Sequence, residues 1–198
     1  KHYQASLRLD PNDARTYNGI GLLLADNGRL EDAIIAYRQA LRCDPGFADA
    51  HNNLGNALAK TGSFEEAIEH YNHALKLDPS YAEAHGNLAV LYTHMGKFKE
   101  AICQYEKALA LDPGFVEAKS NLAALLAQQG NFDEAIRLLT EAIKMKTDFV
   151  DAHVNLALVY YHIGEYSQAW HEANLALKYG AELPQEFLEE IRRKSGNP

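Results

Sequence analysis

The sequence predicts an all-α protein, a solenoid of stacked helix–turn–helix units, and three observations lead to that fold class. An asparagine recurs every 34 residues, at Asn53, Asn87, Asn121 and Asn155, and most of the residues around it recur with it. A proline preceded by an aspartate recurs at the same interval, at Pro11, Pro45, Pro79 and Pro113. Between these prolines, apolar residues follow the spacing of two amphipathic helices, which is typical of a repeat architecture.

The period divides the chain into five full repeats and two terminal pieces. The repeats run over residues 14–47, 48–81, 82–115, 116–149 and 150–183. Residues 1–13 match the second half of an earlier repeat, with Tyr3 and Leu7 in register. Because one helix pair cannot bury both of its faces alone, such units are expected to stack. We therefore expect a single solenoid domain over residues 1–198.

The C-terminal piece, residues 184–194, is expected to form a helix that caps the last repeat. Pro184 suits the first turn of a helix, and Phe187, Leu188 and Ile191 fall on one face of that helix. A helix that docks elsewhere, as a peptide would, is the alternative interpretation of the same apolar stripe.

Each repeat contains a glycine where the first helix must end and the chain must reverse. These glycines are Gly28, Gly62, Gly96, Gly130 and Gly164. Glycine adopts the left-handed conformation of a helix C-cap without a steric penalty. Small residues recur inside the first helix, at Gly21, Gly55, Ala89, Ala123 and Ala157, and large ones in the second, at Tyr37, Tyr71 and Tyr105. This pattern predicts close packing of the two helices.

Two single residues stand out against this pattern. Trp170 precedes Ala173 by three residues on the same helical face, so we expect it to restore volume where Ala173 replaces an aromatic residue. Cys43 occupies the place of Leu77, Leu111 and Met145 in other repeats, which predicts a buried core position. The two cysteines, 60 residues apart at Cys43 and Cys103, have no metal-binding or redox spacing.

The aromatic, Leu-Gly/Ala, Tyr, Ala and Pro positions in this register resemble those of the tetratricopeptide repeat family. The resemblance covers residues 1 to about 180. It implies helix–turn–helix units that stack into a right-handed superhelix, with the first helix of each repeat on the concave side. We therefore expect a non-catalytic scaffold for protein–protein interaction, which binds an extended or helical segment of a partner in its concave groove.

Composition limits the class of partner. The net charge is −8 with histidine neutral, whereas nucleic-acid binding depends on basic residues that neutralise phosphates. No apolar run approaches the roughly 20 residues of a membrane span, and no signal peptide is evident. We expect a cytoplasmic protein that binds a neutral polar or basic protein segment, and neither nucleic acid nor a membrane.

The recurring asparagines, here called the Asn ladder, are expected to lie on the concave face. An amide has one acceptor oxygen and two donor hydrogens, so it can pair with the backbone of an extended peptide. An acidic residue precedes each ladder asparagine by four positions, and polar residues follow on the same face. The predicted peptide-binding residues are Asn53, Asn87, Asn121, Asn155, Asp49, Glu83, Glu117, Asp151, Asn56, His94 and His162.

Three alternatives to this function remain open from the sequence. The ladder and its carboxylates resemble the repeat region of O-linked N-acetylglucosamine transferases, which implies a substrate-recognition role with the catalytic domain absent from these residues. Asparagine at this position is also common across tetratricopeptide repeats, so the ladder can be purely structural. Apolar ends of a solenoid also permit self-association into a homo-oligomer.

No pattern points to catalysis. The chain has no Gly-rich phosphate loop, nucleophile elbow or HExxH motif. His51, His85 and His153 recur at one repeat position, which predicts packing in a partly buried site. His70 and His73 share a face of a second helix with no third ligand in sequence reach. We expect no enzyme activity, no cofactor, no catalytic residue and no metal site.

Overall fold

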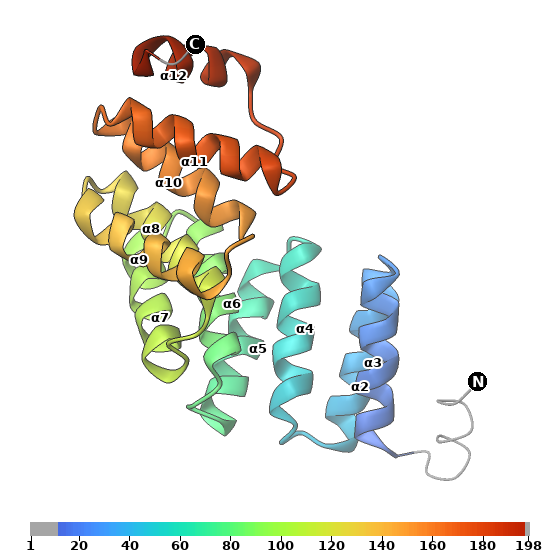
Figure 1. Ribbon diagram of the computed structural model, residues 1–198. Coiled ribbons are helices and arrows are strands. Elements are labelled where there is room, and N and C mark those ends of the chain that lie inside the picture. Colours follow the sequence, from blue (N-terminus) through green and yellow to red (C-terminus); the bar gives the residue numbers. More distant parts are fainter. Residues whose placement is uncertain (1–11, 197–198) are drawn as a thin grey trace. The chain divides into compact units, whose positions relative to one another are not determined.

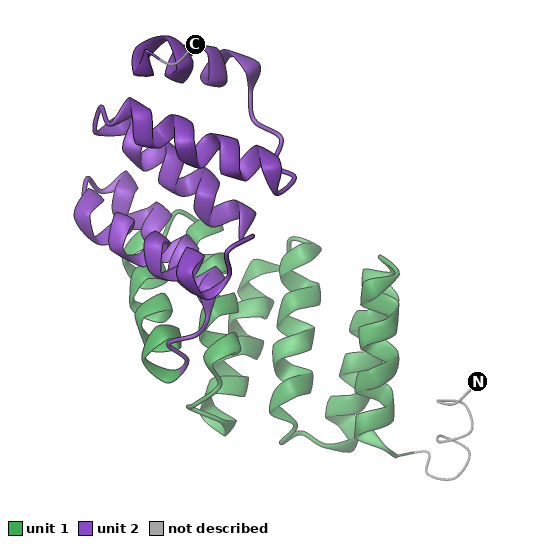
Figure 2. Cartoon of the chain, in the orientation of Figure 1, with its two compact units in different colours: residues 1–111 green, residues 112–198 purple. Residues whose placement is uncertain are grey.

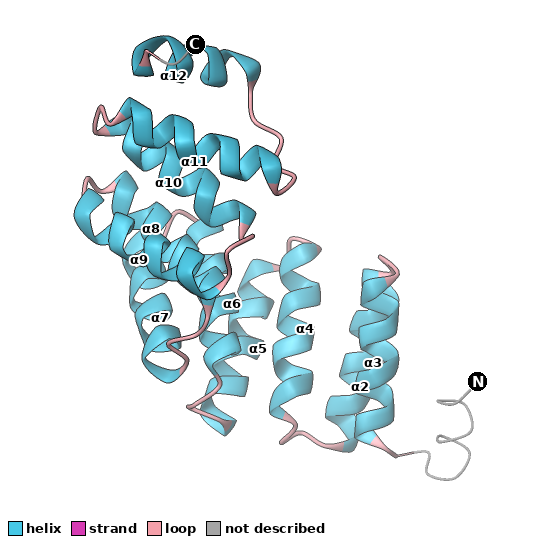
Figure 3. Ribbon diagram, in the orientation of Figure 1, coloured by secondary structure: helices cyan, strands magenta, loops and turns pink. Residues whose placement is uncertain are grey.

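The computed structural model describes residues 12–196, and within this range eleven helices are joined by short turns, without strands (Figure 1, Figure 3). The all-α prediction is confirmed. The first helices of successive pairs are α2 (Ala14–Asp26), α4 (Ala48–Lys60), α6 (Ala82–His94), α8 (Val116–Gln128) and α10 (Val150–His162). The second helices are α3 (Leu30–Cys43), α5 (Phe64–Leu77), α7 (Phe98–Leu111), α9 (Phe132–Met145) and α11 (Tyr166–Lys178), and α12 (Gln185–Ser195) follows. Tyr3 and Leu7 of the predicted half repeat lie outside the described residues.

The chain divides into two compact units, residues 1–111 and 112–198 (Figure 2). The single solenoid domain over residues 1–198 stays a prediction. In unit 1, each helix from α2 to α7 packs on the next, and the first helices also contact each other in the pairs α2–α4 and α4–α6. In unit 2, the same holds from α8 to α12, with α8 in contact with α10. Within each unit, a repeat therefore packs on its neighbours in the chain, as expected for a repeat architecture.

The turn inside each repeat is closed by a glycine in the left-handed conformation, as predicted. At Gly62, φ is +85°, and the backbone N–H of the next residue, Ser63, donates to the carbonyl of Leu58 at 2.9 Å. The other four turn glycines have φ between +71° and +85°. A residue with a Cβ is strained in this conformation, which explains why glycine ends every first helix.

Close contact between the two helices of a repeat depends on a missing side chain. Tyr37 and Tyr71 are almost fully buried. A Cβ added at Gly21 would lie 2.4 Å from the Tyr37 ring, and one at Gly55 would lie 2.8 Å from the Tyr71 ring. In unit 2 the corresponding residues are Ala123 and Leu139, both fully buried. The repeat between them combines Ala89 with Tyr105, both buried, so the steric need for glycine applies to Gly21 and Gly55 only.

Helix α12 packs on the last repeat, which confirms the predicted cap. Ile191 is fully buried in a cluster with Ala157, Ala169 and Ala173. Trp170 packs against the same cluster, in line with its predicted role of filling space around Ala173.

The prediction that Cys43 belongs to a buried row was wrong. Leu77, Leu111 and Met145 at the same repeat position are exposed by 46%, 43% and 55%, and Cys43 is only partly buried. The reason is that this position is the last residue of α3, α5, α7 and α9, where the chain turns away toward the next repeat. Separately, none of the helices in residues 12–196 combines the length and apolar character needed to cross a bilayer.

We expect Gly21→Ala to destabilise the protein by about 1–3 kcal/mol through overpacking against Tyr37. This outcome opposes the intrinsic helix preference, which favours alanine by about 0.5–1 kcal/mol. Urea denaturation measures the difference. The double variant Gly21→Ala/Tyr37→Leu, which copies the Ala123–Leu139 combination, should lose less stability than the sum of the single changes. Additive losses would contradict the proposed contact.

Candidate functional site

Three of the four ladder asparagines link neighbouring first helices. The Nδ2 of Asn53 donates to Asn18 Oδ1 at 3.0 Å, that of Asn87 to Asn52 Oδ1 at 3.1 Å, and that of Asn155 to Ser120 Oγ at 3.0 Å. Each acceptor lies 35 residues earlier, on the preceding first helix. The acceptors are buried, whereas the three ladder residues are partly exposed. The ladder is therefore part of the packing between repeats.

Asn121 differs from the other three. It is exposed, and its side chain makes no hydrogen bond within the described residues. The expectation of four fully open amides therefore needs correction. Asn53, Asn87 and Asn155 each commit an N–H to the protein, because a buried acceptor faces them, and keep an amide oxygen without a partner in the described residues.

The four predicted carboxylates, Asp49, Glu83, Glu117 and Asp151, all lie exposed in the first turn of a first helix. No salt bridge engages them within residues 12–196. Asp49 forms a hydrogen bond with Tyr81, and burial together with this carboxylate raises the Tyr81 pKa. A carboxylate at a helix N-terminus is favourable in itself, and the exposed Glu83, Glu117 and Asp151 are also available to a basic ligand.

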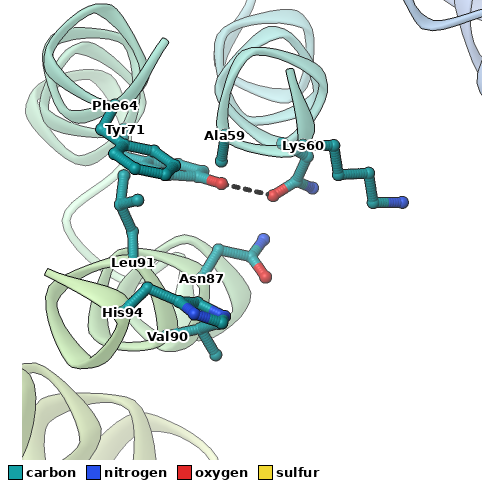
Figure 4. Close-up of a pocket in the computed structure, with 9 residues that line it drawn as sticks. Ala59, Lys60, Phe64, Tyr71, Asn87, Val90, Leu91 and His94 are labelled. Atoms are coloured by element: carbon teal, nitrogen blue, oxygen red, sulfur yellow. Dashed lines mark hydrogen bonds between the residues drawn. The ribbon is translucent and has the colours of Figure 1, made fainter. Parts of the chain in front are cut away.

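A cavity of about 310 Å³, here the Asn87 cavity, lies between α4 and α6. Ala59, Phe64, Val90 and Leu91 form its apolar surface; Asn56, Lys60, Tyr71, Asn87 and His94 complete the lining. Figure 4 shows Asn87 and His94 on one helix and Ala59 and Lys60 on another, facing the same space. Tyr71 donates to Asn56 Oδ1 at 2.6 Å, so the Asn56 oxygen is already engaged.

Unit 2 contains a second cavity of about 220 Å³, here the Asn155 cavity. It is lined by Ala124, Ala127, Gln128, Asn155, Leu158, Val159 and His162. Each of these residues stands 68 positions after a residue of the Asn87 cavity, which is two repeat lengths. A ladder asparagine, an aliphatic pair and a histidine therefore recur at one place in the repeat.

The cavities bring together five of the predicted site residues: Asn56, Asn87, His94, Asn155 and His162. Asn53, Asn121 and the four carboxylates do not line them. Sequence reasoning missed Phe64 and Tyr71, because they come from a second helix. It also gave no weight to Val90 and Leu158, which are exposed by 36% and 39%. The feature that could have identified Val90 and Leu158 is an aliphatic residue on an otherwise polar face of the first helix.

The histidines of the shared repeat position are buried, as predicted: His51, His85 and His153 are at most 8% exposed. His70 and His73 have no third ligand nearby in the sequence, but the fold brings His51 to them. His51 Nδ1 lies 2.9 Å from His70 Nδ1, and the His73 ring stacks on the His51 ring with 5.1 Å between centroids. The two helices of the repeat bring these rings together. No group of three or more His, Cys, Asp or Glu in residues 12–196 has a geometry that could hold a metal ion.

The class of protein follows from the repeat and from comparison with known families. Tetratricopeptide repeat models match residues 2–35, 21–62, 46–113, 95–140 and 126–182, which together span residues 2–182. The chain belongs to the tetratricopeptide repeat family. No curated protein matches it by sequence.

Solved structures with the same fold include those of YrrB, MamA and PilF. YrrB, described as a TPR protein with an unusual peptide-binding site, is 20% identical with a TM-score of 0.72, and the match covers 98% of each chain. MamA is 27% identical over 81% of this chain and 94% of its own, with a TM-score of 0.70. PilF of Pseudomonas aeruginosa is 22% identical over 93% of this chain and 87% of its own, with a TM-score of 0.82. The resemblance to O-linked N-acetylglucosamine transferases is not supported by these similarities.

We expect Asn87→Ala and Asn121→Ala to differ in stability. The first leaves the buried Asn52 oxygen without its donor, which costs about 1–3 kcal/mol. The second removes no hydrogen bond and should stay within about 0.5 kcal/mol of the parent protein. Urea denaturation of both variants provides the comparison. Equal losses would show that the ladder hydrogen bond contributes nothing to folding.

The histidine pair should make stability depend on pH. Burial, and next the neighbouring His51, lower the pKa of His70 to about 4, whereas an unfolded histidine titrates near about 6.5. The unfolded chain thus binds the proton first, and the stabilisation present above pH 6.5 is lost as the pH falls toward 4. Urea midpoints at pH 7.5, 5.5 and 4.5 measure this loss. His70→Gln should flatten the dependence; an unchanged slope would contradict the assignment.

Proposed function

We propose that this chain is a non-catalytic scaffold that binds an extended segment of a partner protein across its first helices. The observation that supports the proposal most directly is the recurrence of one cavity, with the same asparagine, aliphatic pair and histidine, in both units. A fold needs no open apolar cavity at that position, and exposed Val90 and Leu158 are available to a ligand.

In this proposal an apolar side chain of the partner enters each cavity. The free oxygen of Asn87 or Asn155 accepts a backbone N–H of the same segment, and exposed Asn121 offers a complete amide. The carboxylates at the helix starts favour lysine or arginine in the partner. YrrB, a protein of the same fold, is described as having a peptide-binding site.

Most of the binding free energy is expected to come from the cavities, because burial of a side chain contributes more than one hydrogen bond. Burial of an aliphatic side chain contributes about 1.5–3 kcal/mol, whereas one hydrogen bond contributes about 1 kcal/mol net. The cost of ordering a flexible segment must be subtracted from both. The ladder therefore fixes the position of the segment, and the apolar contacts hold it.

The sequence also suggests self-association through apolar ends of the solenoid. At the C-terminal end, that apolar surface is already covered within the chain. Helix α12 covers the last repeat, and Ile191 beneath it is fully buried. The expected homo-oligomer remains a prediction, which light scattering at increasing concentration tests.

We expect arginine substitutions in the cavities to weaken the binding of a partner segment. Peptides selected from a random library against the parent protein should bind Val90→Arg or Leu158→Arg at least tenfold more weakly, because the new side chain fills the cavity. Leu77→Arg is the matched control, since Leu77 is also apolar and exposed but lies at the end of a second helix. Fluorescence anisotropy measures the affinities. Equal binding to all three variants would exclude the cavities as the site.

A further inference from the structure

A third cavity, of about 310 Å³, lies in unit 1 and shares no residue with the Asn87 cavity. Here called the His51 cavity, it is lined by Arg38, Leu41, Arg42, Pro45, His51, Leu54 and His70. Partly exposed Leu41 supplies apolar surface, whereas Leu54 behind it is fully buried. The polar part consists of two arginines and two histidines, in a chain with a net charge of −8. No acidic residue is among the lining.

The hydrogen bonds of the two histidines define their protonation. His51 Nε2 lies 3.2 Å from the carbonyl of Pro45, which only accepts, so Nε2 carries the hydrogen. His51 Nδ1 then accepts from the Nδ1–H of His70 at 2.9 Å. Both rings are neutral in this arrangement. Within the pair, His70 Nε2 is the ring nitrogen that carries no hydrogen and accepts none, so an added proton binds there, 3.8 Å from Glu66 Oε1, and the contact between the two rings is kept.

The charged groups around the pair come from three helices. Arg38 on α3 pairs with Glu66 on α5 at 2.6 Å, and Glu66 Oε1 lies 3.8 Å from His70 Nε2. Arg42 on α3 is exposed and forms no ion pair within the described residues. From α4, His51 is stacked against His73 of α5. Arg38 is thus partly neutralised, and Arg42 is the available cation.

The arginines are not required by the repeat. The apolar pair Leu41 and Leu54 recurs as Leu75 and Leu88, and as Leu109 and Leu122. In contrast, the positions of Arg38 and Arg42 hold Asn72 and Lys76, Glu106 and Ala110, and Thr140 and Lys144. The leucines therefore serve the stacking of repeats, and the paired arginines are a feature of this one cavity.

We propose that the His51 cavity is a second binding site, for the carboxylate of an acidic peptide segment, and that binding is coupled to uptake of a proton by the His51–His70 pair. The carboxylate accepts from the Arg42 guanidinium, and an apolar neighbour in the peptide covers Leu41. When the pair takes up a proton from solvent at His70 Nε2, the positive charge of the imidazolium adds to that of Arg42 and attracts the carboxylate. No covalent step is involved.

The direction of the pH dependence follows from linkage. Burial and neighbouring groups lower the pKa of both histidines in the free protein. A bound carboxylate favours the protonated pair and so raises its pKa. Affinity must then increase as the pH falls, by at most about tenfold per pH unit for one proton. A carboxylate ligand itself stays ionised above pH 5.5.

The test uses the full chain and the probe acetyl-Leu-Asp-Leu-Asp-amide, with acetyl-Leu-Asn-Leu-Asn-amide as its uncharged counterpart. Isothermal titration calorimetry is performed at pH 5.5 and 7.5 in about 0.15 M salt, where long-range repulsion is screened beyond about 8 Å. We expect the acidic probe to bind at least fivefold more tightly at pH 5.5 than at pH 7.5. The uncharged probe should bind at least tenfold more weakly than the acidic one at pH 5.5.

Variants separate this site from the rest of the molecule. Arg42→Gln, at an exposed position, should reduce affinity at least fivefold, whereas Lys76→Gln, at the equivalent position one repeat later, should not. His70→Gln should remove the pH dependence while binding at pH 7.5 persists. Val90→Arg in the Asn87 cavity should leave binding of the acidic probe unchanged, which distinguishes this site from the proposed function. Affinity that is independent of pH, or of Arg42, overturns the proposal.

Discussion

The hydrogen bond between a ladder asparagine and the first helix before it is the contact on which the rest of this molecule depends. A helix pair of this size buries only part of its surface and relies on its neighbours for the remainder. The Asn87–Asn52 bond, at 3.1 Å, pairs a buried polar oxygen that would otherwise be unsatisfied. It also sets the register between two first helices, and the cavity beside Asn87 exists because the helices are held in that register.

The same residue therefore serves both folding and recognition. One N–H of the Asn87 amide is used inside the protein, and its oxygen remains at the edge of the cavity. A ligand thus meets a side chain whose rotamer is already fixed, which reduces the entropy lost on binding. The structural and the functional interpretation of the ladder, which look like alternatives in the sequence, are compatible at this position. Asn121 lacks the internal bond and does not share this preorganisation.

The fold was largely predictable from the sequence, because period and local chemistry agree. Gly62 and its equivalents end the first helices because their backbone is left-handed, and Gly21 leaves room for the buried ring of Tyr37. The site was only partly predictable. A helical face can be derived from spacing, but the cavity also needs Phe64 and Tyr71 from another helix. Likewise, His51 and His70 are 19 residues apart, and no local pattern shows that their rings meet. The prediction that Cys43 is buried was wrong for a related reason, because apolar residues at this helix-end position do not have to be buried.

The repetition of one cavity in two units has a consequence for how tightly a partner is held. A segment with a single suitable side chain gains one modest contact and dissociates readily. A segment with two such side chains converts the second contact into an intramolecular event, and its avidity then depends on the effective concentration set by the intervening residues. The length and stiffness of that spacer in the partner, more than the composition of either cavity, would decide which proteins stay bound.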